Sequence, residues 1–295
     1  MLSTKKICII VIDINKNIPQ WLDIFLLSCS KNVSIDWLLF TNYKVEVDKF
    51  ENINHEYITP KRFEKIVKTE IDITPDFTHS DGYYKLCDFR PTYGVIFKEY
   101  IKKYDYWGHC DTDQIFGNII NNLNDKEILN YDIISSRKNV TSGHFTLYKN
   151  THHINTLFTK CKKWKYILTQ PDLHAFDERG FPKLRGGITR VIKQENINVL
   201  WNRNRFNYPD HIISARQRKY KKCPGTLSDD DKWLISDSKI EYMGDEDLFQ
   251  LDRPHEVMYI HFQNWKHSTT FVNNIDVRNW EPGQPCMITS SGAVL

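Results

Sequence analysis

Several features that define large protein classes are missing from this 295-residue sequence. The apolar run at residues 7–12 is too short to cross a bilayer, and no small-residue cleavage site follows it. Seven cysteines are present, but none has the CxxC spacing of a zinc site, and no disulfide framework is recognisable. We therefore expect a cytoplasmic protein.

The phosphate-binding loops of common phosphoryl-transfer enzymes are also missing, because the sequence has neither a P-loop nor a kinase-type glycine-rich loop. The formal net charge is +3, which is too small to predict nucleic-acid binding. Positive charge is concentrated locally in one segment that contains Arg216, Arg218, Lys219, Lys221 and Lys222. That segment is either a solvated loop or a contact for anionic lipid head groups or an acceptor diphosphate at the inner face of the cell membrane.

What is present is the composition of an ordinary soluble globular protein. Hydrophobic residues make up 40% of the chain and charged residues 26%, which excludes a disordered or membrane-embedded chain. No internal repeat or low-complexity linker interrupts the sequence. The chain is long enough to bury a substantial core, and we expect a single domain.

The first part of the sequence predicts a strand, a helix and a second strand in succession. Residues 6–14 are almost continuously apolar and β-branched, as in a central strand that is buried on both faces. Apolar residues at helical spacing over 19–31 precede a second strand at 35–41. Such a βαβ unit is normally right-handed and parallel. The sequence predicts an α/β fold with a mixed, mostly parallel central sheet and helices on both faces.

Later elements follow the same pattern. We expect a strand at 54–59 and a short helix at 60–69, then a helical stretch over 83–104 that Pro91 interrupts. Further strands are expected at 104–110, 131–136, 144–148 and 257–262, and a helix at 151–166.

Two aspartates separated by one residue follow the aromatic strand at 104–110. Asp111 and Asp113 stand where open α/β sheets bind ligands, at the carboxyl end of a strand. In an extended segment, side chains two residues apart point the same way, so both carboxylates can share one cation. Hard divalent cations prefer oxygen ligands and can bridge to phosphate oxygens.

Several short motifs surround this pair. They are FTN at 40–42, KLCDFRPTYG at 85–94, WGHCDTD at 107–113 and GHFTLYKN at 143–150. Together they resemble bacterial capsule and O-antigen polysaccharide-biosynthesis glycosyltransferases, enzymes of the GT-A fold that are distantly similar to glycogenin-like transferases. The resemblance covers most of the first 180 residues and returns near His261.

The resemblance implies an enzyme that moves a sugar from a nucleotide-diphosphate donor to a glycan or lipid-linked acceptor. It assigns Asp111 and Asp113 to a Mn²⁺ or Mg²⁺ ion that carries the donor diphosphate. Residues 1–150 would form the nucleotide-sugar-binding half of the domain 1–295, and residues 151–295 the acceptor-binding half.

Four further residues match polar positions of that family. Thr41 and Asn42 match positions near the nucleotide base, although the family often has Thr-Asp where this chain has asparagine. Lys85 and Asp88 match positions on a helix that covers the donor sugar. The alternative for Lys85 and Asp88 is a solvated helix face that carries an ion pair.

A late segment, YIHFQNWK at 259–266, resembles the element that completes the metal site in glycogenin-like enzymes. By that resemblance, His261 ligates the metal and Lys266 contacts the diphosphate. An imidazole can ligate Mn²⁺, and an ammonium can stabilise the leaving nucleotide. Without these partners, His261 would be a strand-end histidine bonded to the backbone.

Asp177 and Glu178 follow the second group of predicted strands. GT-A enzymes commonly have an acidic residue in this region that faces the acceptor and the donor sugar, so these two are the candidates for the catalytic carboxylate. Since the two are neighbours, we expect one to face the site, Asp177 by preference, and the other to face solvent. The alternative is an acidic helix cap. Two other functions stay open at this point: a non-catalytic carbohydrate-binding protein and a metal-dependent nucleotidyltransferase.

Overall fold

The computed structural model describes residues 5–78, 84–123, 130–137, 139–181, 186–201, 232–236, 239–243, 257–263, 265–275 and 284–294. These residues form two compact units. The first contains the described residues within 1–17, 34–111 and 124–202, and the second those within 18–33, 112–123 and 203–295. The units are thus interleaved along the chain.

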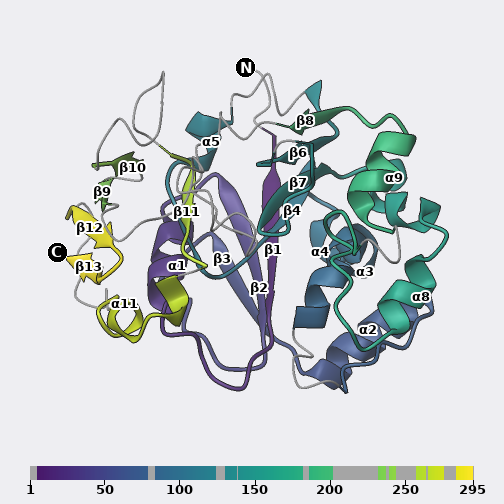
Figure 1. Cartoon of the computed structure of the whole chain (residues 1–295), viewed down its shortest axis with the longest axis horizontal. Coiled ribbons are helices and arrows are strands. Elements are labelled where there is room, and N and C mark those ends of the chain that lie inside the picture. The colour runs from purple at the N-terminus through teal and green to yellow at the C-terminus, as the bar shows by residue number, and fades with distance from the viewer. Residues whose placement is uncertain are drawn as a thin grey trace, which may run out of the picture. The chain divides into compact units, whose positions relative to one another are not determined.

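The first unit is built on a seven-stranded sheet of order β3-β2-β1-β4-β7-β6-β8 (Figure 1). Its strands are β1 (Ile7–Asp13), β2 (Ile35–Thr41), β3 (Ile53–Tyr57), β4 (Tyr106–Cys110), β6 (Ile133–Ser135), β7 (Phe145–Lys149) and β8 (Val199–Trp201). Strand β7 runs antiparallel to both of its neighbours, and every other pairing is parallel. The predicted α/β fold with a mixed, mostly parallel sheet is confirmed.

Strand β1 lies at the centre of the parallel part, and both of its faces are buried. Ile9 and Ile10, which point to opposite faces, are each 0% exposed, as the continuous apolar run predicted. In the register, Asp13 is aligned with Thr41 of β2, and Thr41 with Tyr57 of β3. The carboxyl ends of the three strands therefore meet at one edge of the sheet.

Helices of the first unit pack on the sheet face that carries Cys8 and Ile10 of β1. Figure 1 shows α3, α4, α8 and α9 together beside this part of the sheet. The helical segments are α2 (Pro60–Ile71), the 3-10 helix η1 (Tyr84–Thr92), α3 (Tyr93–Ile96), α4 (Lys98–Ile101), α7 (His152–Asn155), the 3-10 helix η2 (Leu157–Lys160), α8 (Trp164–Thr169) and α9 (Ile188–Gln194).

Helix α2 begins as its sequence predicted. The hydroxyl of Thr59 accepts the backbone N–H of Arg62, and Pro60 occupies the first turn, where no N–H is needed. Phe63 and Val67, one helical turn apart, are buried against the sheet.

Two predicted helices are broken into shorter pieces. The stretch over 83–104 was expected to break at Pro91, and it forms η1, α3 and α4, with Pro91 inside the 3-10 segment. The prediction of one continuous helix over 151–166 is wrong, because α7, η2 and α8 replace it. Thr156 and Thr159 explain part of this break, since their hydroxyls donate to the backbone carbonyls of His152 and Thr156 and compete with regular helix geometry.

The second unit combines α1 (Leu22–Ser30) with one short strand from the middle of the chain and several from its C-terminal part. Its other elements are β5 (Gln114–Phe116), α5 (Ile119–Asn122), β9 (Lys232–Ser236), β10 (Lys239–Tyr242), β11 (Tyr259–His261), the 3-10 helix η5 (Trp265–His267), α11 (Thr269–Asn273), β12 (Cys286–Thr289) and β13 (Gly292–Val294). Strands β10, β9, β12 and β13 form an antiparallel sheet, and β11 pairs antiparallel with β5. The expected late strand at 257–262 is confirmed as β11, whereas β5 was not predicted.

In the part of the chain that the structure describes, we find no helix with the length and apolar character needed to span a membrane.

Gly108 of β4 allows a test of how closely this strand approaches β7. A Cβ at this position would lie 2.8 Å from the backbone carbonyl oxygen of Thr146 and 2.5 Å from a methyl group of Leu147. The side chain can move, but the backbone of the paired strand cannot move without a cost. Gly108→Ala should lower the free energy of unfolding, measured in urea, by about 1–3 kcal/mol. Lys61→Ala, on the exposed face of α2, is the control and should change it by less than about 0.5 kcal/mol.

Candidate metal site

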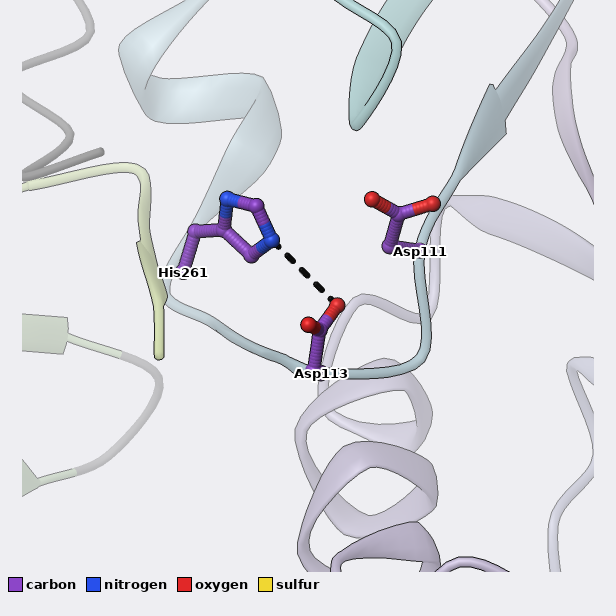
Figure 2. A group of neighbouring side chains, drawn as sticks. All are labelled: Asp111, Asp113 and His261. Atoms are coloured by element: carbon purple, nitrogen blue, oxygen red, sulfur yellow. Dashed lines mark ion pairs between the residues drawn. The ribbon is translucent and has the colours of Figure 1, made fainter. Parts of the chain in front are cut away.

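The Asp-x-Asp segment joins two strands. Strand β4 ends at Cys110, Asp111 follows it directly, and Asp113 immediately precedes β5. The antiparallel register places His261 of β11 opposite Gln114 of β5, so the imidazole lies beside Asp113. One ligand atom from each of Asp111, Asp113 and His261 lies within 4.8 Å of the others, and Figure 2 shows the ring of His261 facing Asp113.

Asp113 is a buried carboxylate with two basic partners. Its Oδ2 accepts from Nζ of Lys266 at 2.6 Å, and its Oδ1 lies 3.3 Å from Nε2 of His261. Asp113 and His261 are only 4% and 3% exposed. Burial opposes ionisation here, but the charges and hydrogen bonds of His261 and Lys266 outweigh it and lower the pKa of Asp113. The carboxylate is therefore ionised at neutral pH, the state in which it can bind a metal.

Asp111 has a different counter-ion, Arg90 of η1. The guanidinium donates from Nη2 to Asp111, and from Nη1 to Asp177 at 3.0 Å and to the Gly143 carbonyl at 2.5 Å. One planar side chain thus joins the end of β4, the loop before β7 and the turn that carries Asp177. Arg90 lies within the KLCDFRPTYG motif, but its role could not be predicted from that motif.

Asp177 is buried and its carboxyl is hard to ionise. Burial and the nearby carboxylates of Glu178 and Asp88 raise the pKa of Asp177 to about 8, against the lowering effect of Arg90. A carboxyl with this pKa loses and accepts a proton near neutral pH.

Glu178 does not turn to solvent, so that part of the prediction is wrong. Its Oε1 accepts from the Gly143 backbone N–H at 3.1 Å and from Arg137 at 2.8 Å. A Cβ at position 143 would lie 2.8 Å from Oδ2 of Asp177 and 3.1 Å from Oε1 of Glu178. Because Gly143 has no Cβ, the carboxylates of Asp177 and Glu178 both fit beside its backbone.

Lys85 and Asp88 are placed differently from either expectation. Both side chains are 0% exposed, which rules out a solvated ion pair. Nζ of Lys85 donates to Asp88 Oδ2 at 2.9 Å, to the Asp172 carbonyl at 2.9 Å and to the Ile167 carbonyl. The three ammonium hydrogens are used within the chain, so we no longer assign Lys85 to the donor sugar.

Thr41 and Asn42 lie at the carboxyl edge of the sheet, where the sequence placed them. Thr41 Oγ1 is 2.8 Å from Nε2 of His55 and donates to the Tyr43 carbonyl at 2.5 Å. The Asn42 amide accepts the Asn15 backbone N–H and donates to the Asn15 carbonyl, both at 3.0 Å. These contacts fix the loop after β2 against the loop after β1.

Asp13 is a member of this edge that the sequence analysis missed. Its carboxylate accepts from the hydroxyl of Tyr43 and from the side-chain amide of Asn15. The signal was available, because Asp13 ends the central strand β1, and ligands bind at the carboxyl ends of strands in open α/β sheets.

The basic segment with Arg216, Arg218, Lys219, Lys221 and Lys222 lies outside the described residues.

A protein-family model matches residues 12–291, and it describes a family of unknown function, DUF6625. The match covers nearly the whole chain, and the protein belongs to this family. Comparison with curated proteins finds no match.

The pKa of Asp177 makes a prediction about stability. Between pH 4 and pH 8 the folded state keeps a proton that the unfolded state loses, so Asp177 lowers stability progressively as the pH rises. Asp177→Asn removes this penalty and still accepts a hydrogen bond from Arg90. The stability advantage of the variant, measured by urea unfolding, should be close to zero at pH 4 and reach a few kcal/mol at pH 8.5, by an order-of-magnitude estimate.

Asp48→Asn, at an exposed position of the same unit, is the control for the loss of one acidic group. An advantage of Asp177→Asn that stays constant across this pH range would mean that Asp177 is ionised throughout.

Proposed function

We propose that this protein is a metal-dependent glycosyltransferase of the GT-A fold that uses a nucleotide-diphosphate sugar. The observation that carries the proposal is the group formed by Asp111 and Asp113, which follow β4, with His261 of β11. The seven-stranded sheet that contains β4 is mostly parallel. Open α/β sheets bind nucleotides at the carboxyl ends of their strands. A cation held there is suited to neutralise a diphosphate leaving group.

The ligand set favours a particular kind of metal. Two carboxylates and one imidazole supply oxygen and nitrogen, and the remaining coordination positions of an octahedral ion would be filled by water or phosphate oxygens. Mg²⁺ prefers an all-oxygen environment, whereas Mn²⁺ accepts imidazole readily. We infer that this site binds Mn²⁺ more tightly than Mg²⁺.

The present counter-ions make metal and donor binding interdependent. Arg90 neutralises Asp111, and Lys266 neutralises Asp113, so the carboxylates are already balanced without a metal. A divalent cation has to compete with these side chains for the carboxylates. A diphosphate gives the released Lys266 ammonium a new anionic partner, so each ligand should strengthen the binding of the other.

Different groups would serve the donor and the acceptor. The carboxyl ends of β1 and β2, where Asp13 and Asn42 lie, form the edge at which the nucleoside part of the donor would bind. Thr41 is 0% exposed and supports this edge through its hydrogen bond to the Tyr43 carbonyl. Asp177, with a pKa of about 8, can accept a proton from the attacking hydroxyl of a glycan or lipid-linked acceptor. Arg90 holds that carboxyl on the same guanidinium that binds Asp111.

The metal assignment is tested with Asp113→Asn, which keeps the size of the side chain and removes its charge. The wild type should show a Mn²⁺-dependent rise in melting temperature with a nucleotide sugar, screened among UDP-, GDP-, CMP- and dTDP-sugars. The variant should lose this rise, and its turnover should fall by at least about 10²-fold, since the metal stabilises the leaving group. Asp23→Asn, an exposed carboxylate of the second unit, is the control. Full Mn²⁺ dependence in Asp113→Asn would reject the metal site.

Lys266→Met should change the affinities for Mn²⁺ and for the nucleotide diphosphate in opposite directions. Removal of the ammonium eliminates a competitor of the metal, so Mn²⁺ alone should bind the variant more tightly, by about tenfold for a change of 1.4 kcal/mol. The nucleotide diphosphate should bind more weakly in the presence of saturating Mn²⁺, because its cationic partner is missing. Both affinities are measured by isothermal titration calorimetry. If the two affinities change in the same direction, Lys266 does not exchange between carboxylate and phosphate.

A further inference from the structure

A buried ion pair supports the turn that carries Asp177. The carboxylate of Asp88 accepts three hydrogen bonds, each from a different residue. Nζ of Lys85 donates at 2.9 Å, the backbone N–H of His174 donates at 2.9 Å, and the backbone N–H of Phe176 donates at 2.8 Å. Asp88 is 0% exposed, so these bonds replace all of its hydration.

The residue between the two backbone donors has an uncommon conformation. Ala175 has φ of 51°, in the left-handed region that a residue with a Cβ avoids at a cost of about 1–2 kcal/mol. A left-handed residue turns the N–H groups on either side of it toward a common point, which forms a binding site for an anion. The Asp88 carboxylate occupies that point, and it therefore holds the turn in a conformation that the local sequence does not favour.

The same turn fixes Asp177 from its other side. The Ala175 carbonyl accepts the backbone N–H groups of Glu178 at 3.1 Å and Gly180 at 2.9 Å. The hydroxyl of Thr141 donates to the Asp177 carbonyl at 2.7 Å. Backbone motion at Asp177 is thus restrained from both ends, and the direction of its side chain depends on the turn that Asp88 closes.

The supporting pair and the partner of Asp177 belong to one segment. Lys85 and Asp88 lie on η1, and Arg90, which contacts the Asp177 carboxylate, lies two residues further along the same 3-10 helix. A single short element therefore sets both the backbone and the side chain of Asp177.

We propose that Lys85 and Asp88 are positioning residues for Asp177, and that they set the rate of the chemical step without contact with the donor. The inference rests on the proposed function, in which Asp177 accepts the acceptor proton. Small misplacements of a catalytic group reduce turnover strongly, whereas substrate affinity depends on other contacts. The pair should consequently affect kcat and leave the KM for the donor unchanged.

The test uses Lys85→Met/Asp88→Asn together with both single variants. Each single variant leaves one buried group without its charged partner and should be strongly destabilised. The double variant removes both charges, so its stability should recover above that of either single variant. Its turn, however, has lost the anion that binds the N–H groups of His174 and Phe176. If the pair positions Asp177, kcat of the double variant should stay at least about tenfold below the wild type, with an unchanged KM for the donor.

Val67→Ala, a core variant in α2, is the control for loss of stability alone and should keep the wild-type kcat. If kcat of the double variant returns to the wild-type value as stability recovers, the pair has only a structural role and the proposal is overturned.

A second measurement does not require turnover. Amide hydrogen exchange of Glu178 and Gly180, whose N–H groups bond to the Ala175 carbonyl, reports how firmly the turn is held. In the double variant both amides should exchange at least about tenfold faster than in the wild type, because the turn has lost the anion that closes it. Unchanged exchange overturns the inference even if the wild type is active. A wild type that turns over no donor, combined with faster exchange in the double variant, rejects the glycosyl-transfer proposal and supports the placement of the turn by Asp88.

Discussion

The guanidinium of Arg90 is the interaction on which the candidate site in the first unit depends. It binds Asp111 after β4, Asp177 after a distant turn and the carbonyl of Gly143 before β7. These three segments are far apart in the sequence. Without a central cation, the two carboxylates would repel each other and the carbonyl would lack this hydrogen bond. Because the two carboxylates share one guanidinium, each of them is only partly neutralised by it. This sharing is consistent with an ionisable Asp177 whose pKa is raised by burial although a cation is 3.0 Å away.

Among the described residues, several ionisable side chains are buried and are neutralised by partners within the chain. Lys85 with Asp88, Arg90 with its two acids, and Lys266 with Asp113 are each neutralised in pairs or small groups. Each pair costs desolvation energy that hydrophobic side chains of similar size would not require. Retention of such groups in otherwise apolar surroundings is typical of sites where stability is exchanged for chemical function. By contrast, the helices and strands behind them carry an ordinary apolar core.

The fold was largely predictable, whereas the site was predictable only where it is local in sequence. Strand β1, the boundaries of β2 and the start of α2 agree with the pattern of apolar and charged residues in the sequence. Asp111 and Asp113 could be found because they are two residues apart at a strand end. The three-residue strand β5 is too short to have a period, and so its pairing with β11 could not be foreseen. Arg90 and the buried place of Lys85 were missed because a sequence shows that a residue is charged but does not show which distant carbonyls and carboxylates surround it.

The pairing of β5 with β11 also has a consequence for the order of folding. Asp113 and Lys266 are 153 positions apart, and His261 is brought to Asp113 by a strand of only three residues. Contacts with such a long sequence separation close late, because the intervening chain must first lose much of its freedom. During synthesis, the ribosome has released most of the protein before either late residue becomes available. A nascent chain that already contains the complete seven-stranded sheet would still lack the imidazole and the ammonium, and a premature stop before residue 261 would yield a chain that has both aspartates but not the rest of the group.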